Sequence, residues 1–125
     1  MKKLIYNPDG EKHGFILFPA KFGEKWGKIE KKEHIFIYSS DFEYIISSIK
    51  NIFPFTDPET GEEQEFFDMC GMNCIPVYLW TDILKNLQEK ERYKDIKLKQ
   101  FISEFCSWIS EKQKKADEIM VWGTL

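Results

Sequence analysis

The chain has 125 residues, of which 42% are hydrophobic and 16% aromatic, and its net charge at pH 7 is −3. This length and composition fit one globular domain with its own hydrophobic core and exclude a disordered chain. No apolar run reaches the roughly 18 residues of a membrane span, and the N-terminal apolar run is too short for a signal peptide. Three cysteines, an odd number, fit a reducing compartment better than a disulfide framework. We therefore expect a single cytoplasmic domain over residues 1–125.

Strand patterns dominate the first forty residues. Two apolar runs, residues 4–6 and 14–18, flank the turn sequence Asn-Pro-Asp-Gly at positions 7–10, and together they predict a β-hairpin. A short strand is expected around residues 25–29, and the run Ile-Phe-Ile-Tyr at residues 35–38 predicts a further strand. The N-terminal part is therefore expected to form an antiparallel sheet, made of a hairpin and a meander.

The periodicity becomes helical after Ser40. Apolar residues from Phe42 to Ile49 recur at i, i+3, i+4 and i+7, which is one face of a helix. Ser40 and Glu43 have the S-x-x-E spacing of a capping box, so the helix is expected to start there. Pro54 is expected to close the segment.

The C-terminal half is predicted to be mainly helical. A loop over residues 55–61 is followed by an acidic segment expected to form a short helix. The stretch FFDMCGMNCIPVYLW, residues 66–80, is interpreted as the end of that helix, a sharp turn at Gly71 and a new helix starting at Pro76. The longest helix is predicted over residues 96–115, with Trp108 in the core, and a last strand over residues 119–122 is expected to join the N-terminal sheet. We therefore expect an α+β fold with three to four helices packed on one face of the sheet.

The cysteines and histidines do not form a recognisable reactive motif. Cys70 and Cys74 have the spacing C-x3-C, whereas a zinc site needs four ligands, and Cys106, His13 and His34 are distant in sequence. A cysteine nucleophile would need one of the histidines to be brought close by the fold. Phosphate-binding loops, nucleophile elbows and metalloprotease motifs are missing from the sequence. We expect all three cysteines to be structural, assign no catalytic residue, metal ligand or cofactor, and favour a protein that is not an enzyme.

Lysine and aromatic residues interleave in KFGEKWGKIEKK, residues 21–32. This pattern is found in proteins that bind single-stranded nucleic acid by stacking. However, the net charge is negative and the basic residues are almost all lysine, with a single arginine at Arg92. We therefore interpret the segment as a solvated β-meander and expect neither nucleic acid nor a membrane as a partner.

An acidic run is the most unusual feature of the sequence. Residues 41–68 contain eight acidic residues and one lysine, a net charge of −7. Six of the carboxylates fall within twelve residues without a basic residue between them: Asp57, Glu59, Glu62, Glu63, Glu65 and Asp68. Their order lacks the pattern of an EF-hand calcium loop. The run is either a solvated face or a docking surface for a cationic protein, and we select the six residues as candidate partner-binding residues.

The general style of FFDMCGMNCIPVYLW, FISEFCSWISEKQKKADEIMVWGTL and the acidic stretch before them resembles small bacterial immunity proteins of toxin–immunity pairs. The resemblance implies a toxin inhibitor that binds its cognate toxin stoichiometrically. From the charge pattern, we expect the acidic surface to bind a cationic protein such as a nuclease-type toxin domain, whose working surface must attract phosphate. The alternative is a small cytoplasmic enzyme or ligand-binding module with a pocket near Cys70, Asn73 and Trp80.

Overall fold

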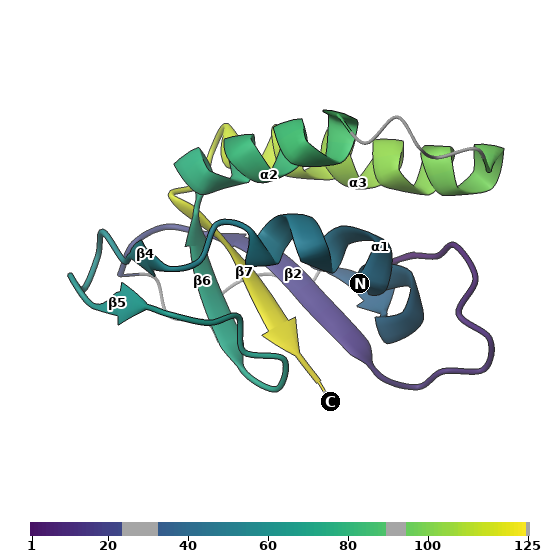
Figure 1. Ribbon diagram of the computed structural model, residues 1–125, viewed down its shortest axis with the longest axis horizontal. Helices are drawn as coiled ribbons and strands as arrows, with labels where there is room; N and C mark the ends of the chain where they lie inside the picture. The colour runs from purple at the N-terminus through teal and green to yellow at the C-terminus, as the bar shows by residue number, and fades with distance from the viewer. Residues whose placement is uncertain (24–32, 90–94, 125) are drawn as a thin grey trace.

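The computed structural model describes residues 1–23, 33–89 and 95–124. Within these ranges the chain forms a five-stranded sheet, a two-stranded hairpin and three helices (Figure 1). The sheet has the order β1-β3-β2-β7-β6. Its strands are β1 (Lys2–Leu4), β2 (Gly14–Ala20), β3 (Ile35–Tyr38), β6 (Met72–Pro76) and β7 (Glu118–Gly123). The hairpin is β4 (Phe55–Thr56) with β5 (Glu63–Gln64), and the helices are α1 (Ser39–Lys50), α2 (Val77–Glu89) and α3 (Ile96–Gln113).

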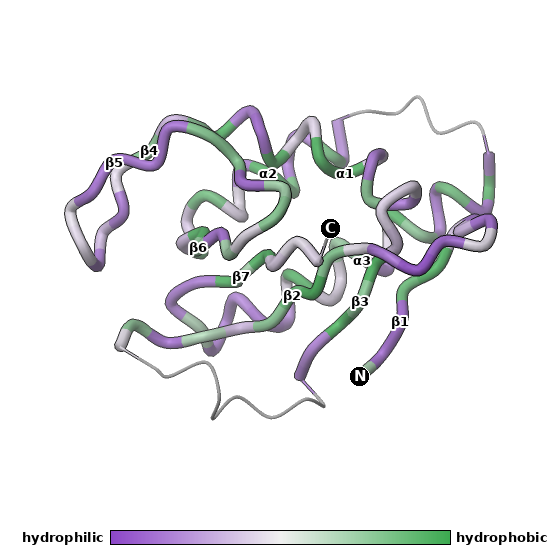
Figure 2. The backbone as a smooth tube through the Cα atoms, turned by 90° about the horizontal axis from the view of Figure 1, so that it is seen from below, coloured by the Kyte–Doolittle hydropathy of each residue, from purple (hydrophilic) through white to green (hydrophobic). Residues whose placement is uncertain are grey.

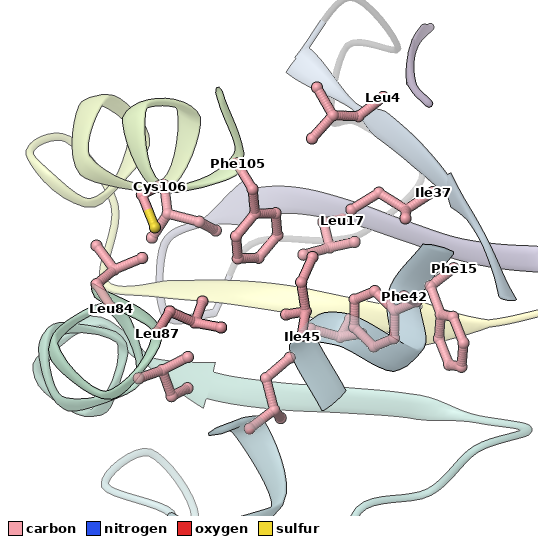
Figure 3. Close-up of a cluster of buried hydrophobic side chains, with 14 of the residues drawn as sticks. Leu4, Phe15, Leu17, Ile37, Phe42, Ile45, Leu84, Leu87, Phe105 and Cys106 are labelled. Carbon is pink, nitrogen blue, oxygen red and sulfur yellow. The ribbon is translucent and has the colours of Figure 1, made fainter. Parts of the chain in front are cut away.

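All three helices pack on one face of the sheet, as the sequence predicts. Successive residues of a strand point to opposite faces, so Leu17, Ile37 and Val121 lie on the helix-covered face with no exposed surface. Figure 3 shows Leu17 and Ile37 with Ile45 of α1 in this core. The α+β fold is thereby confirmed. None of the described helices is long and apolar enough to cross a membrane.

The predicted N-terminal hairpin is wrong. β1 does not pair with β2; it runs parallel to β3, which lies between them and is antiparallel to β2. The connection between β1 and β2 contains the expected turn, with positive φ at Asp9 and Gly10, but it passes the end of β3 instead of closing a hairpin. The buried carboxylate of Asp41 fixes this connection by accepting the backbone N–H groups of Tyr6 and Asn7, each at 2.8 Å.

The capping box predicted at Ser40 does not form. Helix α1 starts at Ser39, directly after β3, and no side chain of its own caps it. Instead the backbone N–H of Ser40 donates to Glu11 Oε2 at 2.7 Å. Hydrogen bonds from Ser40 lower the pKa of Glu11, and the positive helix N-terminus also favours a carboxylate there. The predicted apolar face is confirmed, since Phe42, Ile45 and Ile49 are buried.

The acidic helix predicted after Gly61 is absent from the described chain. Residues 55–64 form the β4–β5 hairpin, with Thr56 opposite Glu63. Its turn is held by Asp57, whose backbone N–H donates to the Glu62 carbonyl and whose carbonyl accepts the Gly61 N–H, both at 2.8 Å. Gly61 has φ of +75°, which a glycine adopts without strain. Local turn bonds therefore replace the helix that the acidic pattern indicated.

The stretch 66–80 contains a turn, strand β6 and the start of α2, not the predicted pair of helices. Asn73 holds the turn: its side-chain amide donates to the Asp68 carbonyl at 2.8 Å and to the Val121 carbonyl at 3.0 Å, while its Oδ1 accepts the Asp68 N–H at 2.8 Å. A Cβ at Gly71 would lie 2.2 Å from the Asp68 carboxylate, so a larger residue there would require the Asp68 side chain to move. Helix α2 then follows Pro76 close to the expected position.

The last helix and strand agree with the sequence. Helix α3 begins at Ile96, where Asp95 caps it by accepting the Lys97 N–H at 2.9 Å. Strand β7 joins the sheet between β2 and β6. However, Trp108 is only half-buried. Among the described tryptophans the fully buried one is Trp80, whose indole N–H donates to the Ile119 carbonyl at 3.2 Å. The strand expected at residues 25–29 lies outside the described residues.

Candidate functional site

The candidate partner-binding residues lie on the β4–β5 hairpin and the loop that follows it. Figure 1 shows the hairpin at one end of the molecule, beside β6 and on the far side from the turn that joins β1 to β2. Figure 2, which colours the backbone by hydropathy, shows that the residues of the hairpin are mainly hydrophilic. The structure therefore places the acidic run on a projecting element.

One of the six carboxylates serves the fold. Asp57 is only 6% exposed, and its Oδ1 accepts the backbone N–H of Glu59 at 2.8 Å. Because this carboxylate organises the turn and is buried, it does not belong to the exposed part of the acidic run. This burial could not be predicted from the sequence, since Asp57 has the same acidic neighbours as the exposed residues.

Two more carboxylates are exposed but already accept hydrogen bonds. Glu59 Oε1 accepts the Gly23 N–H at 2.7 Å, which ties the hairpin to the end of β2. Asp68 Oδ1 accepts the Cys70 N–H at 2.9 Å within the following turn. These bonds leave other carboxylate lone pairs open to a partner, because an ionised carboxylate has about four acceptor positions.

Glu62, Glu63 and Glu65 form the open part of the acidic run. All three are exposed, and their side chains accept no hydrogen bond from the described residues. Since nothing described in the fold uses their charges, they can be replaced with little loss of stability. These three carboxylates, called the hairpin triad below, are the part of the site best suited to contact a cation.

An exposed aromatic ring directly follows the hairpin triad. Phe66 is 80% exposed, whereas its neighbour Phe67 is 9% exposed and packs in the core. Desolvated aromatic residues dominate the binding energy of many interfaces. The sequence alone did not identify Phe66, because the pair Phe66-Phe67 looks equally apolar at both positions. Only the direction of the chain after β5 separates the two rings.

A second group of acidic residues lies where the hairpin meets the sheet. Glu118, the first residue of β7, is 4% exposed. Burial, then the charges of Glu59, Asp57 and Asp117, raises the pKa of Glu118 to about 7. Burial, together with Glu118, Asp57 and Glu59, also raises the pKa of the Cys74 thiol to about 12. Glu118 could not be identified from the sequence, since a lone glutamate at the start of a strand carries no distinguishing pattern.

The three cysteines have different environments. Cys106 is buried in the core, and burial raises the pKa of its thiol to about 11. Cys74 is half-buried on the opposite face of the sheet, beside the small cluster around Met120. Cys70 is exposed, so it does not fill the inside of the bend as predicted. Among the described residues, no three histidines, cysteines or carboxylates are grouped so that they could hold a metal ion.

The polar groups proposed for a small-molecule pocket are used by the fold. Trp80 is fully buried, with its indole N–H bound to Ile119. Asn73 is 6% exposed and bonds through both ends of its amide to backbone groups. Cys70 is exposed and lies in the turn before β6. The arrangement offers no free polar group from Trp80 or Asn73 to orient a ligand.

A partly exposed apolar surface occupies the other face of the sheet. Trp122 is 44% exposed and lies beside Ile16 of β2 and Met72 of β6. Phe36 and Tyr38 of β3 lie on the same face, where the Lys3 ammonium is 5.5 Å from the Tyr38 ring centre. This surface differs in composition from the hairpin triad. It consists mainly of aromatic and aliphatic side chains, and the charge at its β1 edge is the positive charge of Lys3.

Comparison of the chain with family models, with curated proteins and with solved structures gave no match in any of the three searches.

Proposed function

We propose that the chain is an immunity-type inhibitor that neutralises a cognate toxin by presenting the acidic β4–β5 hairpin to a cationic surface of that toxin. The observation that carries the proposal is the hairpin triad beside Phe66. Three carboxylates without described partners and one ring that is 80% exposed lie within residues 62–66 on a projecting element. Such an arrangement suits contact with another protein better than it suits chemistry on a small molecule.

The charge pattern favours a nuclease-type toxin domain as the partner. A nuclease must attract phosphate groups, so its working surface is basic. Carboxylates of an inhibitor can occupy that surface in place of phosphates. Opposite charges on two approaching proteins raise the association rate, and this effect weakens as salt is added. The cytoplasm, where such a toxin would act on its own producer, is the location this role requires.

Phe66 supplies the apolar contact that charge alone lacks. Exposed ion pairs contribute only about 0–1 kcal/mol each, since water and salt screen them. A buried aromatic anchor contributes about 2 kcal/mol or more in many interfaces. We therefore assign the association rate mainly to the hairpin triad and the lifetime of the complex mainly to Phe66.

The direct test is co-expression with the C-terminal domain of the protein encoded by the adjacent upstream gene, which this role requires to be toxic. The expected result is rescue of growth and a complex of the two proteins that co-purifies. The variant Glu62→Lys, Glu63→Lys and Glu65→Lys should keep the fold and slow association about tenfold or more at low salt, because it reverses three steering charges. Stopped-flow association at low and high salt measures this effect.

A matched control carries the same charge change away from the hairpin. Glu43, Asp82 and Glu104 are exposed residues of α1, α2 and α3. When all three are replaced by lysine, the association rate should remain much higher than that of the hairpin variant Glu62→Lys, Glu63→Lys and Glu65→Lys. If both triple variants slow association equally, net charge and not the hairpin steers binding. Absence of both rescue and a complex would refute the inhibitor role.

The role of Phe66 is tested by dissociation. Phe66→Ser should speed dissociation of the complex about thirtyfold, which corresponds to about 2 kcal/mol. Tyr78→Ser on α2 is the control, since Tyr78 is also an exposed ring, at 56%, but lies outside the hairpin. An unchanged dissociation rate in Phe66→Ser would remove Phe66 from the interface.

A further inference from the structure

We propose that Glu118, Asp57 and Glu59 together bind one cationic side chain, a lysine or an arginine, that the partner inserts where the hairpin meets the sheet. These three residues are called the carboxylate cluster below. The inference rests on the proposed function and adds to it a specific contact. It assigns a binding role to Glu118, a residue outside the acidic run.

Backbone pairing fixes the position of Glu118. It lies opposite Ala20 of β2 and Pro76 of β6, in the middle of three adjacent strands. The next residue, Ile119, is in the helix-covered core. Because side chains alternate along a strand, the Glu118 carboxylate lies on the other face of the sheet.

The hairpin brings two more carboxylates to this place. Asp57 is buried, and Glu59 bonds to the Gly23 N–H, which fixes the hairpin tip next to the end of β2. The neighbouring Asp117 uses Oδ2 to accept the Phe22 N–H at 3.0 Å. Carboxylates from two separate parts of the chain therefore converge at one end of the sheet.

Glu118 has no partner there among the described residues. Only 4% of Glu118 is exposed. No described side chain or backbone N–H donates a hydrogen bond to its carboxylate. Burying an ionised carboxylate without a cation or hydrogen-bond donors is unfavourable, because the group loses part of its hydration. An ammonium or guanidinium group that binds there would offset the cost of burying the charge of Glu118. The carboxylates of the hairpin triad are exposed to water, so a cation gains less by binding to them.

The class of ligand follows from the chemistry of the three carboxylates, which only accept hydrogen bonds when they are ionised. The described carboxylates are not arranged to hold a metal ion, so a group that brings its own hydrogen-bond donors is favoured. Lysine provides three N–H donors and arginine five, enough to reach more than one carboxylate. Glu59 is the exposed member, so a side chain that arrives from solvent meets it first.

A bound cation and a proton compete for the Glu118 carboxylate, so cation binding can be measured as a change in the pKa of Glu118. The groups that face Glu118 are Asp57 and Glu59 of the hairpin, Asp117 before β7 and the Cys74 thiol of β6. Burial and the three carboxylates raise the pKa of Glu118 to about 7. A bound cation favours the ionised carboxylate, so it must lower this pKa.

The first test uses side-chain analogues and does not need the partner. The Glu118 carboxyl carbon is followed by NMR from pH 5 to 9 in n-butylammonium chloride, in methylguanidinium chloride and in sodium chloride at equal ionic strength. At least one organic cation should lower the pKa of Glu118 by about one unit relative to sodium. Tetramethylammonium, which has no N–H donor, should act like sodium. Equal pKa values in all four salts would overturn the proposal.

The second test uses the partner complex and the variant Glu118→Gln. With a pKa of about 7, the ionised fraction of Glu118 rises about tenfold from pH 6 to pH 8. If binding requires ionised Glu118, the affinity for the partner should rise by the same factor. This rise should vanish in Glu118→Gln and persist in the control Glu65→Gln. An unchanged pH dependence in Glu118→Gln would exclude Glu118 as a contact.

The two tests separate this proposal from the proposed function. If lysine substitutions in the hairpin triad slow association but neither test implicates Glu118, the carboxylate cluster is wrong and the inhibitor role remains. If the cations lower the pKa of Glu118 but the neighbouring toxin domain forms no complex, the cluster binds cations and the inhibitor role is wrong.

Discussion

Replacing Glu118 by glutamine should change how the stability of the free protein depends on pH. The folded chain raises the pKa of Glu118 from its ordinary value of 4.5 to about 7, chiefly through burial. Between these pH values the folded protein holds a proton that the unfolded chain releases, so the free energy of unfolding falls as pH rises. The fall is complete somewhat above pH 7.

The size of this effect follows from the two pKa values. One pKa unit corresponds to about 1.4 kcal/mol, so a pKa of about 7 in place of 4.5 destabilises the ionised folded protein by at most about 3 kcal/mol. Glutamine keeps the shape and removes the charge. Glu118→Gln should therefore be the more stable protein at pH 8, by about 2–3 kcal/mol, and differ little from the parent at pH 4.5.

Urea unfolding at several pH values from 4.5 to 8.5 measures the effect, with intrinsic fluorescence and circular dichroism as probes. Glu63→Gln is the matched control, because Glu63 is exposed and its side chain makes no hydrogen bond to the described residues. The free energies of unfolding of the parent and Glu118→Gln should diverge as pH rises, while Glu63→Gln follows the parent. Parallel curves for all three proteins would refute the burial argument for Glu118.

Three further predictions concern the fold. Asp41→Ala should lower the free energy of unfolding by about 2–4 kcal/mol, because two backbone N–H groups lose a charged acceptor; a loss below about 0.5 kcal/mol in urea unfolding would contradict the role given to this carboxylate. Trp80→Phe should lower the free energy of unfolding by about 2–4 kcal/mol, because it leaves a cavity and an unpaired Ile119 carbonyl. Thermal unfolding measures this effect, and an unchanged midpoint would contradict the prediction. In native thiol labelling, Cys70 should react quickly, whereas Cys74 and Cys106 should react slowly because burial raises the pKa of their thiols to about 12 and 11; two fast thiols before denaturation would contradict this.

Local periodicity determined the elements that the sequence predicted correctly. Phe42, Ile45 and Ile49 mark the buried face of α1, apolar residues at helical spacing mark that of α3, and an apolar run marks β7. Such patterns depend on residues within one or two turns of each other, so a single sequence contains them in full. The same reasoning gave the α+β class and the acidic character of residues 57–68.

Tertiary structure decided which elements meet and how each charge is used. β1 pairs with β3 because Asp41 and Glu11 hold the intervening connection at the start of α1, and these contacts join residues about thirty positions apart. Asp57 and Glu63 have similar acidic neighbours in sequence, yet one is buried in a turn and the other is exposed. The pKa of Glu118 depends on a hairpin some sixty residues earlier in the chain. Burial and charge act through space, so the identity of a residue and its neighbours along the chain could not determine them.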